Sequence, residues 1–370
     1  MKIAFLDLGG WSYSFETPLH EPMGGTESAL CYLAKEMAQL GHEVTIYNGT
    51  DTAFGSKGIA VRAWTEIHTG ALNQYDGVIV KSQAMGRELR ENLRVTVPLI
   101  LWTQHDVNQP AVKPLIARKE CESWTGIAYV SDWQRERYEA YFQAPQDKGC
   151  VMRNAASPAF LNAATIDATE GPPVLFYTST PYRGLDVLLA AFPAIRAATG
   201  AELRVYSSMD VYRVPAEADQ CRALYDQCRT MEGVHYIGSV GQERLAAELA
   251  GATALAYPST FPETSCIAVI EAMATGAAVF STDLGAIPET SGTHASLIPV
   301  GTDKADLVTR YTGLAIAELQ WMRDNPADAA AQRYQRSCYI RDNYSWPARA
   351  KEWEAWLMEL TGQAVAEAAE

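Results

Sequence analysis

Residues 261–276 read FPETSCIAVIEAMATG, and this stretch indicates the fold more clearly than any other part of the chain. It follows residues 252–257 (ATALAY), which are apolar enough for a buried parallel strand, and it precedes a second apolar strand at residues 277–281. An amphipathic segment lies between the two strands and ends at Gly276, a typical helix stop. The local prediction is therefore strand, loop, helix and strand, as in an α/β protein.

Two carboxylates flank the loop and the helix of this stretch. Glu263 and Glu271 are eight positions apart, and the small polar residues Thr264, Ser265 and Cys266 come directly after the first. A helix that opens near Thr264 and Ser265 directs free backbone N–H groups at the loop, and such a terminus binds phosphate well. Carboxylates beside phosphate repel it, so they fit better with hydroxyl groups on either side of a diphosphate, as in a nucleotide-sugar. Two ordinary surface glutamates are the alternative.

The alternation of strands and helices extends over the whole chain. Short apolar strands alternate with helical patterns in the first half, and the pattern starts again after a small, polar, Pro- and Gly-bearing stretch at residues 158–173. We therefore predict an α/β fold with two Rossmann-like, doubly wound domains, residues 1–165 and 166–345, facing across a cleft. Ligands should bind there at the carboxyl ends of the strands. Residues 346–370 contain a Trp-rich helix, which docks on the rest of the protein.

Composition excludes several classes of protein. A chain of 370 residues exceeds the size of one hydrophobic core, and its net charge of −14 makes nucleic acid a poor partner. No apolar run is long enough to span a membrane. Seven scattered cysteines without a C-x-x-C pair favour a reducing cytoplasm over a disulfide framework or a zinc site. We therefore predict no metal and no cofactor.

A peripheral contact with the inner face of a membrane remains open. Most of the excess negative charge lies after residue 165, so the first half is close to neutral. Lys81, Arg87, Arg90 and Arg94 form its only candidate basic surface, which we expect on one helix. A solvated helix face is the alternative reading of these four residues.

Three further motifs follow predicted strands. Gly24 and Gly25 precede the helix that includes residues 28–39, and glycines there let backbone approach a phosphate, although no P-loop pattern is present. His105 follows the strand PLILW in the sequence TQHD. Arg183 follows the strand PVLFYT in the sequence STPYRGLDVLLAAF, and a guanidinium can bind a phosphate bidentately. A flexible loop and a structural histidine are the alternatives for the first two motifs.

In this order and spacing the motifs resemble those of retaining glycosyltransferases of family 4 (glycosyl transferases group 1), which have the GT-B fold and share an E-x7-E signature. The resemblance implies transfer of a sugar from a nucleotide diphosphate-sugar to a hydroxyl acceptor, with retained configuration, in bacterial polysaccharide or glycolipid assembly. It implies an acceptor-side N-terminal domain, onto which the C-terminal helix crosses back. The acceptor would be a saccharide, a glycolipid or another hydroxyl compound.

The resemblance also implies roles for single residues. His105, Arg183 and Glu263 would be catalytic, and Glu271 would accept hydrogen bonds from the ribose. Asp106 would orient the His105 imidazole or meet the acceptor. The remaining donor contacts would come from Gly24, Gly25, Thr178, Ser179, Gly238, Thr264, Ser265, Cys266 and Ile267.

One departure from the family pattern concerns phosphate binding. Arg183-Gly184 occupies the position of the family's Lys-Gly, but Thr178 and Ser179 stand where a preceding Arg is expected. One of two usual cations is therefore absent. Two alternatives stay open: a nucleotide-sugar epimerase on the same scaffold, and a non-catalytic nucleotide-sugar binding protein. The sequence does not identify the base, the sugar or the acceptor.

Overall fold

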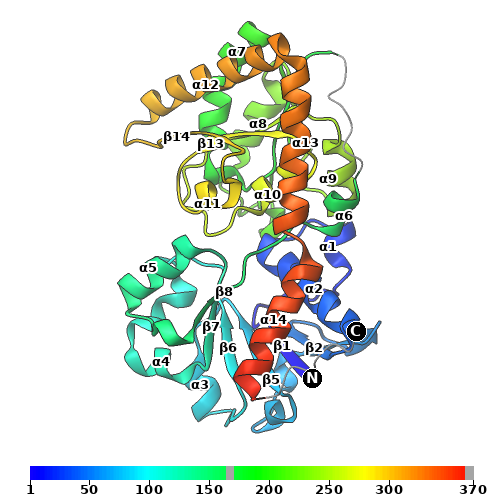
Figure 1. Cartoon of the computed structure of the whole chain (residues 1–370), viewed down its shortest axis with the longest axis vertical. Helices are drawn as coiled ribbons and strands as arrows, with labels where there is room; N and C mark the ends of the chain where they lie inside the picture. Colours follow the sequence, from blue (N-terminus) through cyan, green and yellow to red (C-terminus); the bar gives the residue numbers. More distant parts are fainter. Residues whose placement is uncertain (164–170, 363–370) are drawn as a thin grey trace. The chain divides into compact units, whose positions relative to one another are not determined.

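The computed structural model describes residues 1–163 and 171–362, and the chain folds into two compact units (Figure 1). Unit 1 comprises Met1–Thr17, Gly25–Asn154 and the C-terminal stretch that begins at Trp346. Unit 2 comprises Pro18–Gly24 and Ala155–Ser345. The chain thus changes units between Asn154 and Ala155, whereas the expected boundary at residues 165 and 166 lies outside the described residues.

Unit 1 is built on an eight-stranded sheet of order β3-β4-β2-β1-β5-β6-β7-β8, parallel except for the antiparallel pair β3 and β4. Its central strands are buried throughout, as expected of a parallel sheet covered on both faces. The strands are β1 (Lys2–Leu6), β2 (Glu43–Asn48), β3 (Phe54–Ser56), β4 (Ile59–Ala63), β5 (Gly77–Lys81), β6 (Leu99–Trp102), β7 (Gly126–Tyr129) and β8 (Gly149–Val151). The helices are α2 (Gly25–Gln39), α3 (Gly86–Glu91), α4 (Arg118–Ser123), α5 (Asp132–Phe142) and α14 (Trp346–Thr361).

The C-terminal helix α14 packs on unit 1, as the family resemblance implies. The Trp353 ring lies edge-on to Trp102 of β6, with 5.3 Å between ring centroids. Trp356 lies so close to Gly126 of β7 that a Cβ there would be 2.8 Å from its ring. Two of the three tryptophans in this helix are therefore accounted for by packing against the sheet.

The basic surface expected on one helix is absent, which corrects that prediction. Lys81 ends strand β5 and is buried, and α3 covers only Gly86–Glu91. Arg90 donates hydrogen bonds to the backbone carbonyls of Ser123, Val95 and Val97. The four residues were grouped by spacing in the sequence, but strand geometry and inward hydrogen bonds separate them.

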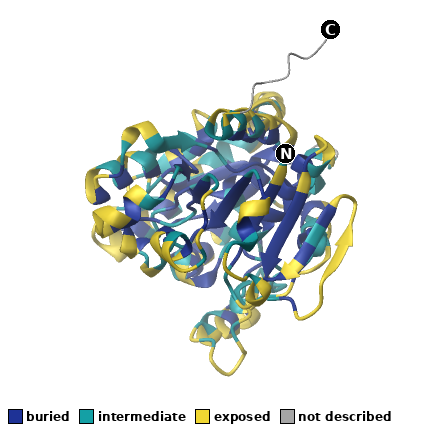
Figure 2. Cartoon of the chain, turned by 90° about the horizontal axis from the view of Figure 1, so that it is seen from below, coloured by how far each residue is buried: buried dark blue, intermediate teal, exposed yellow. Residues whose placement is uncertain are grey.

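Unit 2 is built on a six-stranded, fully parallel sheet of order β11-β10-β9-β12-β13-β14. Figure 2 shows most strands of the chain as buried and the exposed residues mainly on helices and loops. In unit 2 the outer strands β11 and β14 are less buried than the central ones. The strands are β9 (Val174–Tyr177), β10 (Glu202–Val205), β11 (Val234–Tyr236), β12 (Ala254–Tyr257), β13 (Ala278–Thr282) and β14 (Ser296–Ile298). The helices are α6 (Pro158–Asn162), α7 (Leu185–Thr199), α8 (Arg222–Thr230), α9 (Gln242–Leu249), α10 (Ile267–Ala274), α11 (Ile287–Ser291), α12 (Lys304–Asp324) and α13 (Pro326–Asn343).

The short helix α1 (Thr17–His20) begins in unit 1 and ends in unit 2. His20 and the residues up to Gly24 belong to unit 2. The His20 imidazole lies 3.3 Å from the Glu243 carboxylate, and a Cβ at Gly241 would be 2.4 Å from the His20 backbone. A segment near the N-terminus is thus packed tightly against the start of α9.

Candidate functional site

The candidate site in unit 2 lies where the strand order reverses. The chain runs outward from β9 through β10 and β11, and then returns to β12 on the other side of β9. Two loops therefore diverge at the carboxyl ends of neighbouring strands, one after Tyr177 and one after Tyr257. Open α/β sheets bind their ligands at such a switch point.

Two buried tyrosines at the ends of the strands form hydrogen bonds with these loops. Tyr177 and Tyr257 end β9 and β12, and their rings pack edge to face with centroids 5.6 Å apart. The Tyr177 hydroxyl donates to the Thr180 carbonyl at 2.8 Å, and the Tyr257 hydroxyl donates to the Glu263 carboxylate. Ser179 donates to the Tyr257 hydroxyl at 3.3 Å. The last residue of each strand thus holds the loop that follows.

Arg183 and Glu263 form an ion pair across the switch point. One guanidinium nitrogen of Arg183, Nη1, lies 2.8 and 3.0 Å from the two carboxylate oxygens of Glu263. Nη2 donates to the Tyr212 hydroxyl at 3.3 Å, and the guanidinium lies over the Phe261 ring at 4.4 Å. Burial is the largest influence and opposes the charge of Arg183, but Glu263 together with nearby tyrosine hydroxyls outweighs burial and raises the pKa of Arg183. Both predicted catalytic groups of this unit are therefore adjacent, and their charges offset each other.

A close backbone approach joins the two loops beside this pair. Gly184 has φ +120°, and a Cβ there would lie 2.1 Å from the Pro258 carbonyl oxygen. The Thr260 N–H donates to the Arg183 carbonyl at 3.3 Å. Glycine at position 184 lets the loops meet and sets Arg183 opposite Glu263.

Glu263 is also fixed through its backbone. It forms an isolated parallel bridge with Gly285, and its carbonyl accepts from the Ala286 N–H at 2.7 Å. Its side chain is only 7% exposed and accepts from both Arg183 and Tyr257. The carboxylate is therefore held rigidly, which suits a group that positions another residue.

Helix α10 begins at Ile267 with Cys266 in the capping position, about two residues later than expected. Thr264 and Ser265 therefore belong to the loop and not to the first turn. The Cys266 thiol is buried, and burial raises its pKa. The loop from Glu263 to Cys266 leads directly from the ion pair to the N-terminus of α10, so the predicted phosphate-facing segment lies at the expected end of the sheet.

Glu271 occupies a different environment from Glu263. It lies in the second turn of α10, is 6% exposed, and burial raises the pKa of its carboxyl to about 8. A hydrogen bond from the Gln242 side chain, at the start of α9, opposes that rise. The two glutamates of the signature are thus chemically distinct: Glu263 is ion-paired, whereas burial keeps Glu271 protonated at neutral pH.

The remaining predicted donor residues of unit 2 follow strands β9 and β11 of the same sheet. Thr178 and Ser179 come directly after β9, and Gly238 comes after β11 with φ +79° and open space where a Cβ would lie. Next to Gly238, the Ser239 hydroxyl pairs with the Ser208 hydroxyl at 2.8 Å. The structure therefore gathers these residues at one edge of the sheet with Arg183.

In unit 1, His105 and Asp106 follow β6 as predicted. The His105 carbonyl accepts from Gln134 and Tyr138 of α5, each at 2.8 Å, which fixes this turn at the carboxyl edge. Asp106 is 1% exposed, and both of its oxygens accept from Arg137, at 2.6 and 2.9 Å. Asp106 therefore anchors helix α5, and its role in orienting the imidazole or meeting the acceptor stays a prediction.

A buried charge cluster at the switch point of unit 1 was missed in the sequence. The Lys81 ammonium lies 3.0 Å from Asp7, which follows β1, and 2.5 Å from Glu27 in the first turn of α2. Tyr13 donates to Asp7 at 2.7 Å. Burial opposes the charge of Lys81, but Glu27 and Asp7 outweigh burial and raise its pKa. The cluster holds the start of α2, at Gly25, against the sheet; Gly24 precedes it in unit 2.

Two observations concern metals and membranes. Within residues 1–163 and 171–362, no group of three or more His, Cys, Asp or Glu side chains is arranged to hold a metal ion. Across that same part of the chain, every helix is too short or too polar to cross a membrane.

Comparison with known structures defines the fold. Sucrose-phosphate synthase from Thermosynechococcus elongatus matches with a TM-score of 0.73 at 15% identity, over 98% of this chain and 100% of the other. A glycosyltransferase from Rickettsia africae matches with a TM-score of 0.72 at 12% identity, over 98% and 99%. Anabaena HepE, solved with UDP-glucose, matches with a TM-score of 0.69 at 15% identity, over 97% and 100%. The fold is that of the GT-B glycosyltransferases.

The sequence comparison finds a match over the segment that carries the site. The family model described as glycosyl transferases group 1 matches residues 172–315, which include Arg183, Glu263 and Glu271. This segment is therefore similar to the glycosyl transferases group 1 family. No curated protein sequence matches the chain.

Proposed function

We propose that this protein is a retaining glycosyltransferase that moves a sugar from a nucleotide diphosphate-sugar to a hydroxyl acceptor. The observation that carries the proposal is the arrangement at the β9–β12 switch point. There Arg183 is held by Glu263, and the buried carboxyl Glu271 follows on α10. A guanidinium, a helix N-terminus and a carboxyl match the diphosphate and the ribose of such a donor. HepE, a structural neighbour, was solved with UDP-glucose, which makes UDP-glucose the first donor to test.

In the proposed reaction, the bond between the sugar C1 and the diphosphate oxygen breaks while a bond from C1 to the acceptor oxygen forms on the same face. The departing phosphate oxygen takes the proton of the acceptor hydroxyl. Arg183 and the N–H groups at the start of α10 stabilise the charge that develops on the leaving diphosphate. Glu263 holds Arg183 in place and borders the donor sugar, and Glu271 binds the ribose hydroxyls.

The test begins with donor binding. A thermal-shift panel of UDP-, GDP-, ADP- and dTDP-sugars identifies the donor, because a ligand at 100 times its dissociation constant adds about 2.7 kcal/mol of stability. The selected donor is then incubated with saccharide and glycolipid acceptors, and products are identified by mass spectrometry and anomeric NMR. Product that forms only with acceptor and keeps the anomeric configuration supports the proposal. An altered sugar without acceptor would indicate an epimerase, and tight binding without turnover would indicate a binding protein.

We further propose that transfer requires no metal ion, because the positive partners of the diphosphate are Arg183 and backbone N–H groups. Activity in excess EDTA should then equal that of an untreated control. Loss of activity that magnesium or manganese restores would contradict this proposal. It would show that a cation replaces the basic residue absent near Ser179.

A further inference from the structure

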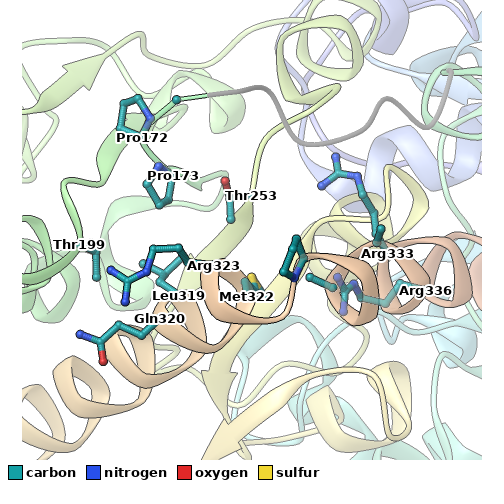
Figure 3. Close-up of a pocket in the computed structure, with 14 residues that line it drawn as sticks. Pro172, Pro173, Thr199, Thr253, Leu319, Gln320, Met322, Arg323, Arg333 and Arg336 are labelled. Atoms are coloured by element: carbon teal, nitrogen blue, oxygen red, sulfur yellow. The ribbon is translucent and has the colours of Figure 1, made fainter.

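Unit 2 has a cavity at the amino ends of β9 and β12, away from the candidate donor site. It has a volume of about 460 Å³ and is lined by Pro172 and Pro173 just before β9, by Thr253 just before β12, and by residues of α12 and α13 (Figure 3). The candidate donor site is at the carboxyl ends of β9 and β12, whereas this cavity is at their amino ends. Its size falls in the range of small-molecule sites.

The cavity wall carries two buried arginines one turn apart on α13. Arg333 and Arg336 are each only 6% exposed. Arg333 donates to the Ala252 carbonyl and Arg336 donates through Nε to the Gly276 carbonyl, each at 2.9 Å. Burial, and then the charge of Arg333, lowers the pKa of Arg336 to about 10. Arg336 therefore stays positively charged at neutral pH, although burial disfavours that charge.

Glu318 favours the charge of Arg336, but less strongly than burial and Arg333 oppose it. Within residues 1–163 and 171–362, no Asp or Glu forms an ion pair with Arg336. The Nε of Arg336 donates to the Gly276 carbonyl. The edge formed by its two Nη groups can therefore bind a planar anion, as guanidinium groups bind carboxylates. A buried charge of this kind is stabilised by a counter-ion.

The rest of the cavity wall is largely apolar. Leu319 and Met322 come from α12, and Pro326, Ala329 and Ala330 come from α13, opposite Pro172 and Pro173. A free inorganic anion would leave this surface without a partner. A ligand with an apolar body would bury it and place its charge on Arg336.

We infer that this cavity binds a small organic monocarboxylate with an apolar body, whose carboxylate meets Arg336. The site is independent of the proposed sugar transfer. A practical probe is 4-phenylbutyrate. Its matched controls are 4-phenylbutan-1-ol, which has the body without the charge, and acetate, which has the charge without the body.

Calorimetry on the full chain tests the inference. 4-Phenylbutyrate should bind saturably with one site, and both controls should bind at least tenfold more weakly. Arg336→Gln should weaken binding about 10- to 100-fold, the usual effect of losing a charge-assisted hydrogen bond. Arg323→Gln is the matched control, because Arg323 lines the same cavity but is 67% exposed and pairs with Asp324, so affinity should change less than twofold.

A second variant covers the case in which Arg336→Gln fails to fold. Ala330 is exposed at the cavity, so Ala330→Trp should block the cavity without removing a charge and should leave the melting temperature unchanged. Binding of 4-phenylbutyrate should then be lost. The inference is overturned if wild type does not bind the probe, if the alcohol binds equally well, or if folded Ala330→Trp binds as wild type does.

Discussion

At the scale of single residues, the ion pair of Arg183 and Glu263 is the feature on which the proposed phosphate contact depends. The Glu263 side chain is 7% exposed, and its contacts with Arg183 and Tyr257 hold the guanidinium over Phe261. A fixed guanidinium loses little entropy when it meets a phosphate. The pair also weakens the local positive charge, so a bound diphosphate has to compete with Glu263 for Arg183.

The first prediction concerns Arg183. Under the proposed function, Arg183→Ala should lower turnover about 100-fold or more, because the leaving diphosphate carries most charge in the transition state. Arg183→Lys should keep part of the activity, since it retains the charge and loses only the planar fork. Arg244→Ala is the control, because Arg244 is 60% exposed and pairs only with Glu248 one turn on. Turnover of Arg183→Ala within threefold of wild type would assign the role to another group.

The second prediction concerns the protonation of Glu271. Its pKa of about 8 means that the carboxyl is mostly neutral at pH 7 in the unliganded protein. Ribose hydroxyls donate to the ionised form, so donor binding should favour loss of that proton. Affinity for UDP-glucose should then rise up to about tenfold per pH unit as pH increases toward 8, and level off above it.

Calorimetry in buffers of different ionisation enthalpy measures this proton release directly. At pH 7, close to one proton should leave per donor bound in wild type and none in Glu271→Gln, which should also bind more weakly. The raised pKa of Glu271 also affects the free energy of unfolding. Because this pKa is higher in the folded than in the unfolded state, the unliganded protein should lose stability as pH rises from about 4.5 through 8. If the donor affinity of the wild-type protein did not change with pH, Glu271 would not be the group that binds the ribose.

At the scale of elements, the meeting of the two switch-point loops depends on Gly184. Gly184→Ala should destabilise unit 2 on the order of 3 kcal/mol, because it adds both a strained φ and a contact 2.1 Å from the Pro258 carbonyl oxygen. Gly200→Ala is a matched control: Gly200 has φ +73° and open space around a Cβ, so strain alone should cost about 1 kcal/mol. Urea unfolding compares the two variants. Equal losses would mean that the loops do not interlock at Gly184.

The start of α2 is held to its sheet by Lys81, which gives a further prediction. Lys81→Met should destabilise unit 1 by about 3–5 kcal/mol, because it leaves Asp7 and Glu27 buried without their cation. Lys57→Met removes an exposed pair with Glu16 and should cost less than about 1 kcal/mol. Thermal unfolding of both variants measures the difference. A Lys81 variant as stable as the Lys57 variant would show that the cluster does not hold α2.

Most core elements could be predicted because each has a local signal. Apolar strands such as β5 and β12 are buried on both faces. Gly276, the predicted helix stop, follows the end of α10 and has φ +82°. The strands β3, β4 and β8 were not predicted, because β3 and β8 are edge strands of three residues each and β4, next to β3, alternates buried with more exposed residues. Local signals do not reveal elements that are stabilised mainly by their neighbours.

The site residues show the same limit. Position after a strand placed Arg183, Glu263 and His105 at carboxyl edges, because parallel topology determines which ends meet. Which side chains pair with one another depends on contacts between distant segments. The Arg183–Glu263 pair spans 80 positions, and the Lys81–Glu27 pair spans 54. The pairing of Asp106 with Arg137 was not foreseen for the same reason, because the two residues are 31 positions apart.

At the scale of the whole molecule, the GT-B fold is preserved at 12–15% sequence identity to the solved structures compared above. Burial of the two parallel sheets tolerates many apolar sequences, so such identity is enough for the fold. Fold alone does not assign an activity, and the function proposed for this chain rests on the switch-point residues. The absence of a second cation near Ser179 is the main chemical difference from the expected pattern.

The central claim is that the carboxyl edge of the unit 2 sheet binds a nucleotide-sugar. A crystal structure with the nucleotide-sugar that stabilises the protein most tests it directly. We expect the ribose hydroxyls to contact the Glu271 carboxylate and the diphosphate to lie between Arg183 and the start of α10. A nucleotide bound away from the β9–β12 switch point, or a diphosphate with no contact to Arg183, would contradict it.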